Sequence, residues 1–461
     1  MTVTATDLAN RPGPRYRALA DCLETAIRDA ALQPGDRLPP QRDLAYDLAV
    51  TVGTVGRAYG LLLQRGLVRG EVGRGTYVQE PGDRPAMPAP IAARAAGHDL
   101  AVNRPVAVPA DTEVFRILGE IAADAANLPQ LLTYPPYAGH EPHRRALADW
   151  LKTFAGDVDP SRIMPCQGTQ NGMAAALATV TRPGDSLLVE ALSYASNQGL
   201  AMRLGLELLP VTTDGDGAIP DSIEALCRAH RPTAIVLSPD LQNPTLATAS
   251  LARREAIVEL ARRHDLAIVE DAVYAPVAAT GLPSFLALAP ERTLYVTSTS
   301  KFLAPGLRFG CVVAPPQRMS ALIGAQAHLA LSVSPLIAEA FARLQHQGVL
   351  DTAVAQQQAA LARRRQVAFD TLTGLTVTSR PNALHVLLDL PDGRDAATTA
   401  LRLANAGIQT TPLGAFAVGR TPVPPTLRLS LGAEPDEASL QHCLSELCHL
   451  LIEETAALPV I

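Results

Sequence analysis

Lysine is rare in this sequence, and one of its lysines has chemically informative neighbours. Of the 39 basic residues, only Lys152 and Lys301 are lysines. A chain that otherwise relies on arginine is expected to keep a lysine where it needs an amine that can lose its proton. Lys301 follows Ser298-Thr299-Ser300, comes after the strand-like apolar run 294–296, and precedes Arg308 by seven residues. This spacing predicts an amine that can form a Schiff base beside an arginine that can bind a phosphate.

The segment around Lys301 resembles the lysine motif of fold-type I pyridoxal phosphate (PLP) enzymes of the class I aminotransferase family. The resemblance implies that Lys301 carries the cofactor and that Ser298, Ser300 and Arg308 help to bind it. It also implies further cofactor ligands upstream, in a fixed order.

A carboxylate follows an apolar run upstream of the lysine. Residues 266–269 read as a short buried strand, and Glu270-Asp271-Ala272-Val273-Tyr274 follows it. A carboxylate there can keep the pyridinium nitrogen of PLP protonated, because an adjacent opposite charge favours each ionised form. The resemblance gives that role to Asp271, and it gives Tyr274 a hydrogen bond to the phenolic oxygen of the cofactor ring.

A second strand-like run, residues 234–237, precedes Ser238-Pro239-Asp240-Leu241-Gln242-Asn243-Pro244-Thr245. This stretch resembles the Asn-Pro loop of the same family, which implies that Asn243 is the other donor to the phenolic oxygen. The family usually has a glycine after the threonine, whereas Leu246 stands here. The geometry of this turn is therefore expected to differ.

A phosphate-binding segment is expected at residues 166–172. Cys166-Gln167-Gly168-Thr169-Gln170-Asn171-Gly172 opens an alanine-rich helical stretch, and the free amides of a helix start attract an anion. Gly168, Thr169 and Gln170 match the family's phosphate loop.

Three further residues take their roles from the resemblance. Tyr194, which follows the strand-like run 187–189, stands where the family has the aromatic residue that stacks on the cofactor ring. Tyr134 matches a tyrosine that reaches the phosphate of the neighbouring subunit. Arg428 lies in the segment whose arginine forms a bidentate contact with a substrate carboxylate. Each short motif alone also fits an ordinary turn or edge strand, and it is the ordered set that favours a PLP fold.

The chain is longer than that fold requires. It has 461 residues, of which 48% are hydrophobic, so it should contain more than one domain. The PLP pattern starts near Leu100. Residues 16–30 predict an amphipathic helix with Leu19, Leu23, Ala26 and Ile27 on one face. A second short helix is expected after the proline-rich residues 32–40.

A third helix is expected from Thr51, as its N-cap, to about Arg65. Its buried side is predicted from the spacing of four residues, Val52, Val55, Tyr59 and Leu62. Thr51, Thr54 and Arg57 form a separate stripe. Residues 66–78 then alternate as a hairpin with a glycine-rich tip.

This order of helices and hairpin is the layout of a winged helix-turn-helix. Its motifs resemble the GntR family, and the predicted DNA-binding residues are Arg42, Thr51, Thr54, Arg57, Arg74 and Thr76. Residues 51–78 carry four arginines and one acidic residue, a net charge of +3, as phosphate contacts require. A small helical dimerisation module with a hairpin is the alternative. Val52 occupies a position where many GntR members have a DNA-contacting arginine.

The predicted organisation is α/β with three segments. Residues 11–79 form the winged helix-turn-helix, residues 80–98 a Pro/Ala-rich linker, and residues 99–461 the aminotransferase-like domain. That domain is expected to have a mixed, mostly parallel sheet and a smaller C-terminal subdomain. A GntR module joined to such a domain is the arrangement of the MocR family of transcription regulators. The resemblance implies a head-to-tail homodimer.

Composition adds several expectations. The chain has no secretory stretch and no run of 18 apolar residues, which predicts a cytoplasmic protein without a membrane anchor. Its six cysteines show no CxxC spacing and are expected to be reduced. The histidines, among them His98, His140 and His143, show no metal-binding spacing, and no metal is predicted.

Two functions of different classes fit these motifs. In the first, a transcription regulator carries PLP on Lys301 and senses a small amino compound by aldimine exchange, which changes operator binding. In the second, an active aminotransferase carries an accessory DNA-binding domain. Both share fold and cofactor, so the complete DNA-binding module, which an enzyme does not need, favours the regulator. A slow half-transamination is compatible with it, whereas a PLP carrier without covalent chemistry would not need Lys301.

The effector is expected to carry an amine for the cofactor and a carboxylate for Arg428. Members of the MocR family answer to amino acids, gamma-aminobutyrate, taurine, ectoine-derived amines and vitamin B6. This chain leans toward the ectoine-derived group. The segment Asn382-Ala383-Leu384-His385 departs from the family's usual Gly-Leu-His, which affects the expected width of the effector pocket.

Overall fold

The computed structural model describes residues 14–29, 31–64, 67–71, 75–78, 97–124, 126, 128–391 and 393–456. The chain divides into two compact units, Met1–Ala92 and Ala93–Ile461, called here the N-terminal and C-terminal units. Most of the predicted linker lies outside the described residues, and its last residue, His98, already belongs to a strand of the C-terminal unit. The domain boundaries remain predictions.

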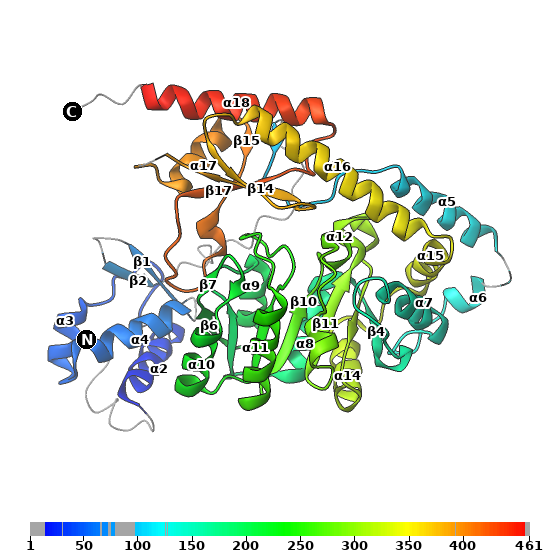
Figure 1. Ribbon diagram of the computed structural model, residues 1–461. Coiled ribbons are helices and arrows are strands. Elements are labelled where there is room, and N and C mark those ends of the chain that lie inside the picture. The colour runs from blue at the N-terminus through cyan, green and yellow to red at the C-terminus, as the bar shows by residue number, and fades with distance from the viewer. Residues whose placement is uncertain are drawn as a thin grey trace. The chain divides into compact units, whose positions relative to one another are not determined.

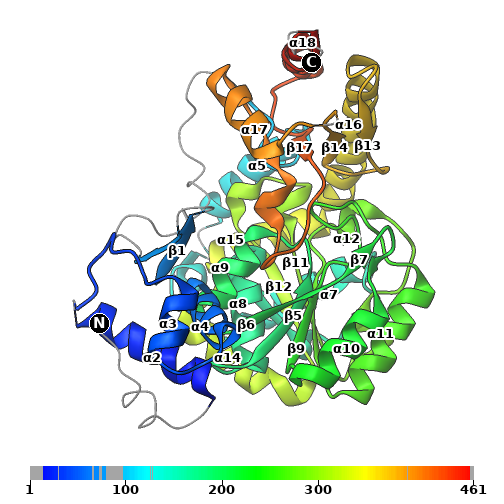
Figure 2. The ribbon, with the colours of Figure 1, turned by 90° about the vertical axis from the view of Figure 1, so that its left-hand side faces the viewer.

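The N-terminal unit (blue in Figures 1 and 2) is a winged helix-turn-helix, as predicted. Its elements are α2 (Arg15–Arg28), α3 (Gln41–Asp47), α4 (Val52–Gln64) and the antiparallel strands β1 (Val68–Glu71) and β2 (Gly75–Val78). Thr51 caps α4, because its Oγ1 accepts a hydrogen bond from the Thr54 amide at 3.2 Å. A small apolar core joins the helices to the hairpin through Leu19, Leu23, Leu38, Leu44, Val55, Leu62, Val68 and Val78.

The prediction that Val52 lies on the buried side of this helix is wrong. Its side chain is 45% exposed, whereas Val55, Tyr59 and Leu62 are buried as predicted. Val52 is the first residue of α4. Side chains tilt toward the N-terminus of a helix, so the first side chain points past the helix start and away from the apolar core.

The C-terminal unit is built on a seven-stranded mixed sheet with the order β4-β12-β11-β10-β9-β5-β6. Neighbouring strands are parallel except at β12, which is antiparallel to both β11 and β4. The strands are β4 (Ile163–Cys166), β5 (Ser186–Glu190), β6 (Glu207–Val211), β9 (Ala234–Leu237), β10 (Ala267–Asp271), β11 (Thr293–Ser298) and β12 (Gly310–Val313). The four apolar runs that the sequence indicated as strands belong to β5, β9, β10 and β11.

Helices cover both faces of this sheet, so its strands are apolar on both sides. Figure 2 shows α8 (Gly168–Val180) and α14 (Met319–Ala330) on one side and α10 (Pro220–His230) and α11 (Leu251–Arg263) on the other. Within β5, Leu187 and Val189 pack in the first layer and Leu188 in the second, as the two-residue period of a strand requires. A Cβ at Gly172 would lie 2.7 Å from a Val296 methyl carbon, so this glycine lets α8 approach the sheet closely.

A smaller C-terminal subdomain contains an antiparallel sheet with the order β13-β14-β17-β16. Its strands are β13 (Thr376–Thr378), β14 (His385–Asp389), β16 (Thr411–Pro412) and β17 (Thr426–Ser430), and its helices are α16 (Val349–Thr371), α17 (Ala396–Asn405) and α18 (Glu437–Ala456). The short strand β3 (His98–Asp99) pairs in parallel with β15 (Ile408–Gln409). The other elements are α5 (Ala110–Ala123), α6 (Leu128–Leu131), α7 (Glu141–Leu151), α9 (Ala195–Arg203), α12 (Ala275–Ala278), α13 (Phe285–Leu288), α15 (Pro335–His346), β7 (Thr213–Asp214), β8 (Gly217–Ala218) and five short 3-10 turns. The winged helix-turn-helix, the mixed, mostly parallel sheet and the smaller subdomain together confirm the predicted fold class.

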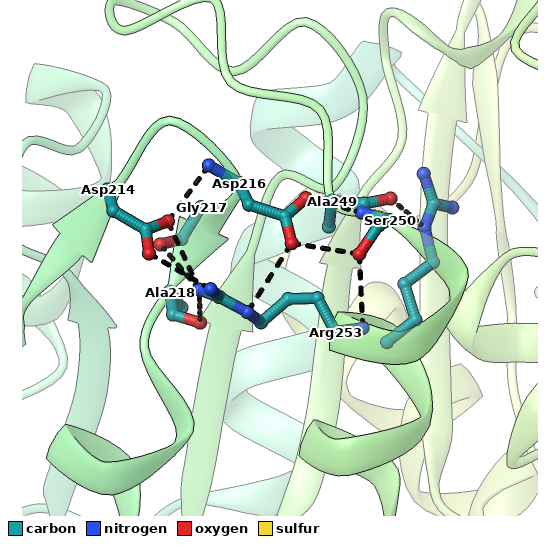
Figure 3. Close-up of polar contacts among 8 residues, drawn as sticks. Asp214, Asp216, Gly217, Ala218, Ala249, Ser250 and Arg253 are labelled. Atoms are coloured by element: carbon teal, nitrogen blue, oxygen red, sulfur yellow. Dashed lines mark hydrogen bonds and ion pairs between the residues drawn. The ribbon is translucent and has the colours of Figure 1, made fainter.

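A polar network fixes the end of the loop that carries Asn243 (Figure 3). The Asp216 carboxylate, in the turn between β7 and β8, accepts hydrogen bonds from the Ser250 amide at 2.6 Å and the Ser250 hydroxyl at 2.8 Å. Arg253 donates to the two oxygens of Asp214 at 3.2 and 2.9 Å. Ser250 also caps α11. The network therefore holds the start of α11 and, with it, the end of the loop.

The remaining compositional expectations concern the membrane and the cysteines. Among the described residues, no helix is both long enough and apolar enough to cross a membrane. All six cysteines fall within the described part of the chain, where none of them forms a disulfide, and five of them are buried. Their reduced state stays a prediction.

Candidate cofactor site and DNA-binding surface

Lys301 lies in a 3-10 turn (Thr299–Lys301) directly after the buried strand β11. Its partly buried amine Nζ donates a hydrogen bond to the main-chain oxygen of Asn103 at 2.7 Å. The same Nζ lies 5.5 Å from the centre of the Tyr274 ring. The amine therefore lies at the carboxyl edge of the sheet, where α/β proteins bind ligands.

The surroundings of Lys301 favour its neutral form. Burial lowers the pKa of Lys301 to about 8, the positive charges of Arg428 and Arg308 add to that effect, and the negative charge of Asp271 opposes it. Burial also raises the pKa of Asp271 to about 6, although a hydrogen bond from the Val273 amide and the charge of Lys301 lower it. At neutral pH the carboxylate is therefore mostly ionised. About a tenth of the amine is neutral, far more than for a lysine with the usual pKa.

Asp271 and Tyr274 reach this edge from the neighbouring strand. Asp271 is the last residue of β10, which runs parallel to β11, and it is 7% exposed. Tyr274 is buried, and its hydroxyl accepts a hydrogen bond from Asn103 Nδ2 at 3.0 Å. Burial raises the pKa of Tyr274, so its hydroxyl keeps its hydrogen and can donate to an acceptor.

Asn243 and Arg428 meet at the same edge. Arg428, in β17, donates through Nη1 to Asn243 Oδ1 at 3.0 Å and through Nη2 to the main-chain oxygen of Ala101. Its guanidinium lies 4.9 Å from the centre of the Phe416 ring. Arg428 is only 4% exposed, and its hydrogen-bond partners among the described residues are neutral oxygen atoms of Asn243, Ala101 and Thr411. The charge of Asp99 acts on it from a greater distance. A buried cation that is not directly paired with a carboxylate is costly, which makes this arginine a candidate anion ligand.

The turn after Asn243 has a leucine where the family usually has a glycine. The backbone at this leucine nevertheless adopts a conformation that favours glycine. Leu246 has a φ of +65° and is 1% exposed. Its amide donates a hydrogen bond to the main-chain oxygen of Gln242 at 2.7 Å, and its side chain packs in the apolar core. Burial of the leucine side chain offsets the cost of the left-handed conformation.

The phosphate-loop residues assemble at the start of α8. Gly168 has a φ of +77°, and a Cβ at this position would lie 2.5 Å from Nη2 of Arg308. The hydroxyl of Thr169 lies 2.8 Å from that of Ser298, which lies 2.8 Å from that of Ser300. Hydroxyls, helix amides and a guanidinium are therefore brought together, which is the donor set that a phosphate needs. Gln170 is half-buried in the same helical turn.

The two tyrosines that the sequence predicted as cofactor ligands, Tyr194 and Tyr134, differ in their surroundings. Tyr194, directly before α9, is 38% exposed and lies near enough to affect the pKa values of Tyr274 and Arg428. It belongs to the site. Tyr134 is 85% exposed and has no hydrogen bond to the other site residues described here. Its predicted contact is with a neighbouring subunit, and it stays a prediction.

Asn103 and His385 are site residues that the sequence reasoning missed or left without a role. Besides its bond to Tyr274, Asn103 Nδ2 lies 3.3 Å from His385 Nδ1, and His385 Nε2 lies 2.9 Å from the Pro244 oxygen. Burial lowers the pKa of His385 to about 3, so the ring is neutral. Because a carbonyl only accepts, Nε2 carries the hydrogen and Nδ1 accepts from Asn103. The only signal in the sequence was a polar residue in the apolar stretch before Arg104.

Five of the six predicted DNA-binding residues lie in the described part of the N-terminal unit, and each of the five is at least partly exposed. Thr51, Arg57 and Arg42 are exposed, and Thr54 and Thr76 are half-buried. The hydroxyls of Thr51 and Thr54 lie 2.9 Å apart, so the helix cap engages part of the face intended for DNA. Arg74 lies outside the described residues.

Comparison with known proteins identifies both units. Residues 106–447 match the family described as aminotransferase class I and II, and residues 15–78 match the gntR family of bacterial regulatory proteins. The chain therefore belongs to the aminotransferase class I and II family and carries a gntR module, which is the domain arrangement of the MocR family of transcription regulators.

Two relatives are similar over nearly their whole length. One is the uncharacterized HTH-type transcriptional regulator YdeF of Bacillus subtilis, at 28% identity over 96% of this chain and 95% of the relative. Another is the HTH-type pyridoxine biosynthesis transcriptional regulator PdxR of Corynebacterium glutamicum, at 27% identity over 93% and 94%.

The C-terminal unit is also similar to a solved structure. This is the alpha-aminoadipate aminotransferase LysN of Thermus thermophilus, solved with N-(5'-phosphopyridoxyl)-L-leucine. The TM-score is 0.71 at 24% identity, covering 78% of this chain and 94% of LysN. At this identity the likeness establishes the fold.

Proposed function

We propose that this chain is a transcription regulator that binds PLP at Lys301 and responds to a small molecule carrying an amine and a carboxylate. The observation that carries the proposal is a complete gntR module in one chain with a partly buried lysine amine at the carboxyl edge of the large sheet. Relatives that share this arrangement over more than nine tenths of their length are named transcriptional regulators. An enzyme would not need the first unit.

The residues around Lys301 fit PLP. When bound, PLP would supply an aldehyde that reacts reversibly with primary amines. Asp271 would hold the ring nitrogen, Tyr274 and Asn243 the phenolic oxygen, and Tyr194 one ring face. The amides and hydroxyls around Gly168 and the guanidinium of Arg308 would hold the phosphate, where a Cβ on Gly168 would displace that guanidinium.

Lys301 and Arg428 together define the class of effector. Another primary amine could replace the amine of Lys301 on the aldehyde carbon of PLP. Arg428 is a buried cation that is not paired with a carboxylate among the described residues. A molecule with both groups would satisfy both residues. An amino acid, including an amino acid derived from an osmolyte, is therefore the proposed effector.

Effector binding can change DNA binding only if the effector binds two states of the protein with different affinities. We place those states in the C-terminal unit, in which Arg428 lies on the smaller subdomain and Lys301 on the large sheet. A molecule held by both would favour a closed arrangement of the two. A head-to-tail homodimer would carry two DNA-binding modules to one operator.

One observation favours a second activity beside regulation. Lys301, Asp271 and Tyr274 remain together with the shifted pKa values that amino-group transfer uses. A slow half-reaction that consumes one amino acid per cofactor fits this set. Many rounds of turnover with a keto acid acceptor would instead favour the aminotransferase alternative.

The rate at which PLP attaches covalently to the cofactor-free chain should rise with pH and level off above about 8. Only the neutral amine can attack an aldehyde, and the pKa of Lys301 is lowered to about 8 from 10.5. Arg428→Gln removes a positive charge that lowers this pKa, so the midpoint should move to higher pH. Asp271→Asn removes a charge that raises it, so the midpoint should move to lower pH. Stopped-flow absorbance measures the rate as a function of pH. A wild-type midpoint near 10.5 would contradict the lowered pKa of the Lys301 amine.

The double variant Thr54→Ala with Arg57→Ala should weaken operator binding by ~10-fold or more and leave PLP attachment unchanged. Contacts to a base or phosphate contribute ~1–3 kcal/mol each, and both side chains lie on the accessible side of α4. DNA retained by the purified chain, once sequenced, supplies the operator for a fluorescence anisotropy titration. Arg28→Ala is the matched control, because Arg28 is an exposed arginine on α2 that pairs with Glu24 of the same helix. Equal affinity of the double variant and wild type would show that α4 is not the reading helix.

A further inference from the structure

A group of three metal-ligating side chains lies outside the cofactor site, between the first strand and the last helix of the C-terminal unit. His98 comes from β3, and His442 and Glu446 come from α18. One potential ligand atom from each lies within 4.8 Å of the others. The two helical residues are four positions apart and therefore share one face of α18.

The distances suit a divalent transition ion. His442 Nε2 lies 3.4 Å from one Glu446 oxygen, and His98 Nε2 lies 3.8 Å from the other. Ligands at zinc–nitrogen and zinc–oxygen distances in a tetrahedral site are separated by roughly 3.3–3.5 Å. His442 and Glu446 have side chains that are 67% and 48% exposed, so small rotations can bring all three atoms onto one ion.

A second carboxylate orients His98 in the manner of a metal ligand. Glu434, whose side chain is 5% exposed, lies with Oε2 3.1 Å from His98 Nδ1. Its other oxygen accepts a hydrogen bond from the Asp99 amide at 3.0 Å, which fixes the carboxylate in place. Because a carboxylate accepts, Nδ1 donates its hydrogen to Glu434, which leaves Nε2, 3.8 Å from Glu446, as the nitrogen that can bind an ion. A carboxylate behind a histidine is the usual support of a zinc ligand.

We propose that His98, His442 and Glu446 form a binding site for a divalent transition metal ion, best matched by zinc. Two imidazoles and one carboxylate are a donor set that zinc uses, and a water molecule would complete the coordination. The ion would tie β3, at the start of the C-terminal unit, to the first half of α18, the last helix of that unit. The spacing of the histidines in the sequence did not indicate this site, because His98 is brought near α18 by contacts between distant segments, the pairing of β3 with β15 and the bonds to Glu434.

The test measures zinc binding to the tag-free, full-length, PLP-loaded chain after treatment with a chelator. Titration calorimetry should show one zinc ion per chain in a site that His442→Ala and Glu446→Gln each weaken by ~10-fold or more. Both substitutions are at the surface, so circular dichroism should remain as in the wild type. His346→Ala is the matched control, since His346 is an exposed helical histidine away from the group, and it should bind zinc like wild type.

X-ray absorption at the zinc edge supplies the second readout. We expect nitrogen and oxygen neighbours with the outer-shell signature of two imidazoles, and loss of one imidazole in His442→Ala. Zinc should also raise the melting temperature of the wild type more than that of His442→Ala, because a ligand that binds the folded state stabilises it. The proposal is overturned if His442→Ala and Glu446→Gln bind zinc as tightly as wild type, if no zinc binds, or if the neighbours are sulfur.

Discussion

Lys301→Ala should abolish covalent attachment of PLP to this chain. The only other lysine, Lys152, directly follows α7. Its side chain is 54% exposed, and its amine lies 3.8 and 3.6 Å from the carboxylates of Asp149 and Asp157. That amine is in contact with solvent and acidic groups, so it has neither the enclosed setting of Lys301 nor a phosphate-binding loop beside it. It cannot take over the attachment.

Intact-mass spectrometry after borohydride reduction checks this result. Wild type and the control Lys152→Ala should each gain the mass of one reduced cofactor, and Lys301→Ala should gain none. Circular dichroism would show that the variant is folded, because Lys301 contributes one hydrogen bond, to Asn103, and its removal leaves the core intact. A full adduct on Lys301→Ala would place the cofactor elsewhere and would also remove the basis of the proposed effector class.

The sequence predicted those site residues that follow a strand in chain order. Asp271, Asn243 and Lys301 each lie at or just beyond the carboxyl end of a strand, and parallel strands bring their ends to one edge of the sheet. The apolar runs that marked β9, β10 and β11 were clear because a sheet covered on both faces needs apolar residues throughout. Position along the chain therefore translated directly into position in the fold.

Residues whose role depends on contacts between distant segments could not be predicted in this way. Asn103 joins Tyr274 and His385, which lie 171 and 282 positions away. Nothing in the stretch before Arg104 indicates these partners. Val52 was misplaced for a different reason, since helical periodicity gives the direction of a side chain and does not tell where the neighbouring helices stop.

Arg428 is expected to determine which small molecules the C-terminal unit recognises. Its guanidinium already donates to Asn243 and to the main chain of Ala101, and its Nε is buried without a partner among the described residues. That nitrogen and the uncompensated charge leave capacity for one carboxylate. A charge-assisted bidentate contact contributes ~1.5–3 kcal/mol, which corresponds to a change of ~10-fold or more in affinity.

Arg428→Gln and Arg428→Lys should therefore each raise by ~10-fold or more the concentration of an amino acid that changes the absorbance of the bound cofactor. The lysine variant is the stricter test, because it keeps the charge and loses only the planar fork. The panel comprises amino acids, diamino acids, taurine and amines without a carboxylate. Simple amines should act equally on wild type and both variants, since they engage the pocket through Lys301 alone.

Operator binding without effector should survive both substitutions, because Arg428 belongs to the C-terminal unit and the predicted DNA-binding residues belong to the other compact unit. This separates loss of recognition from loss of folding. If amino acids and carboxylate-free amines act on wild type at the same concentrations, and the variants respond as wild type does, Arg428 is a structural residue of β17. Its bonds to Asn243 and Ala101 would then serve only to hold the smaller subdomain in place. The effector would be recognised through its amine alone.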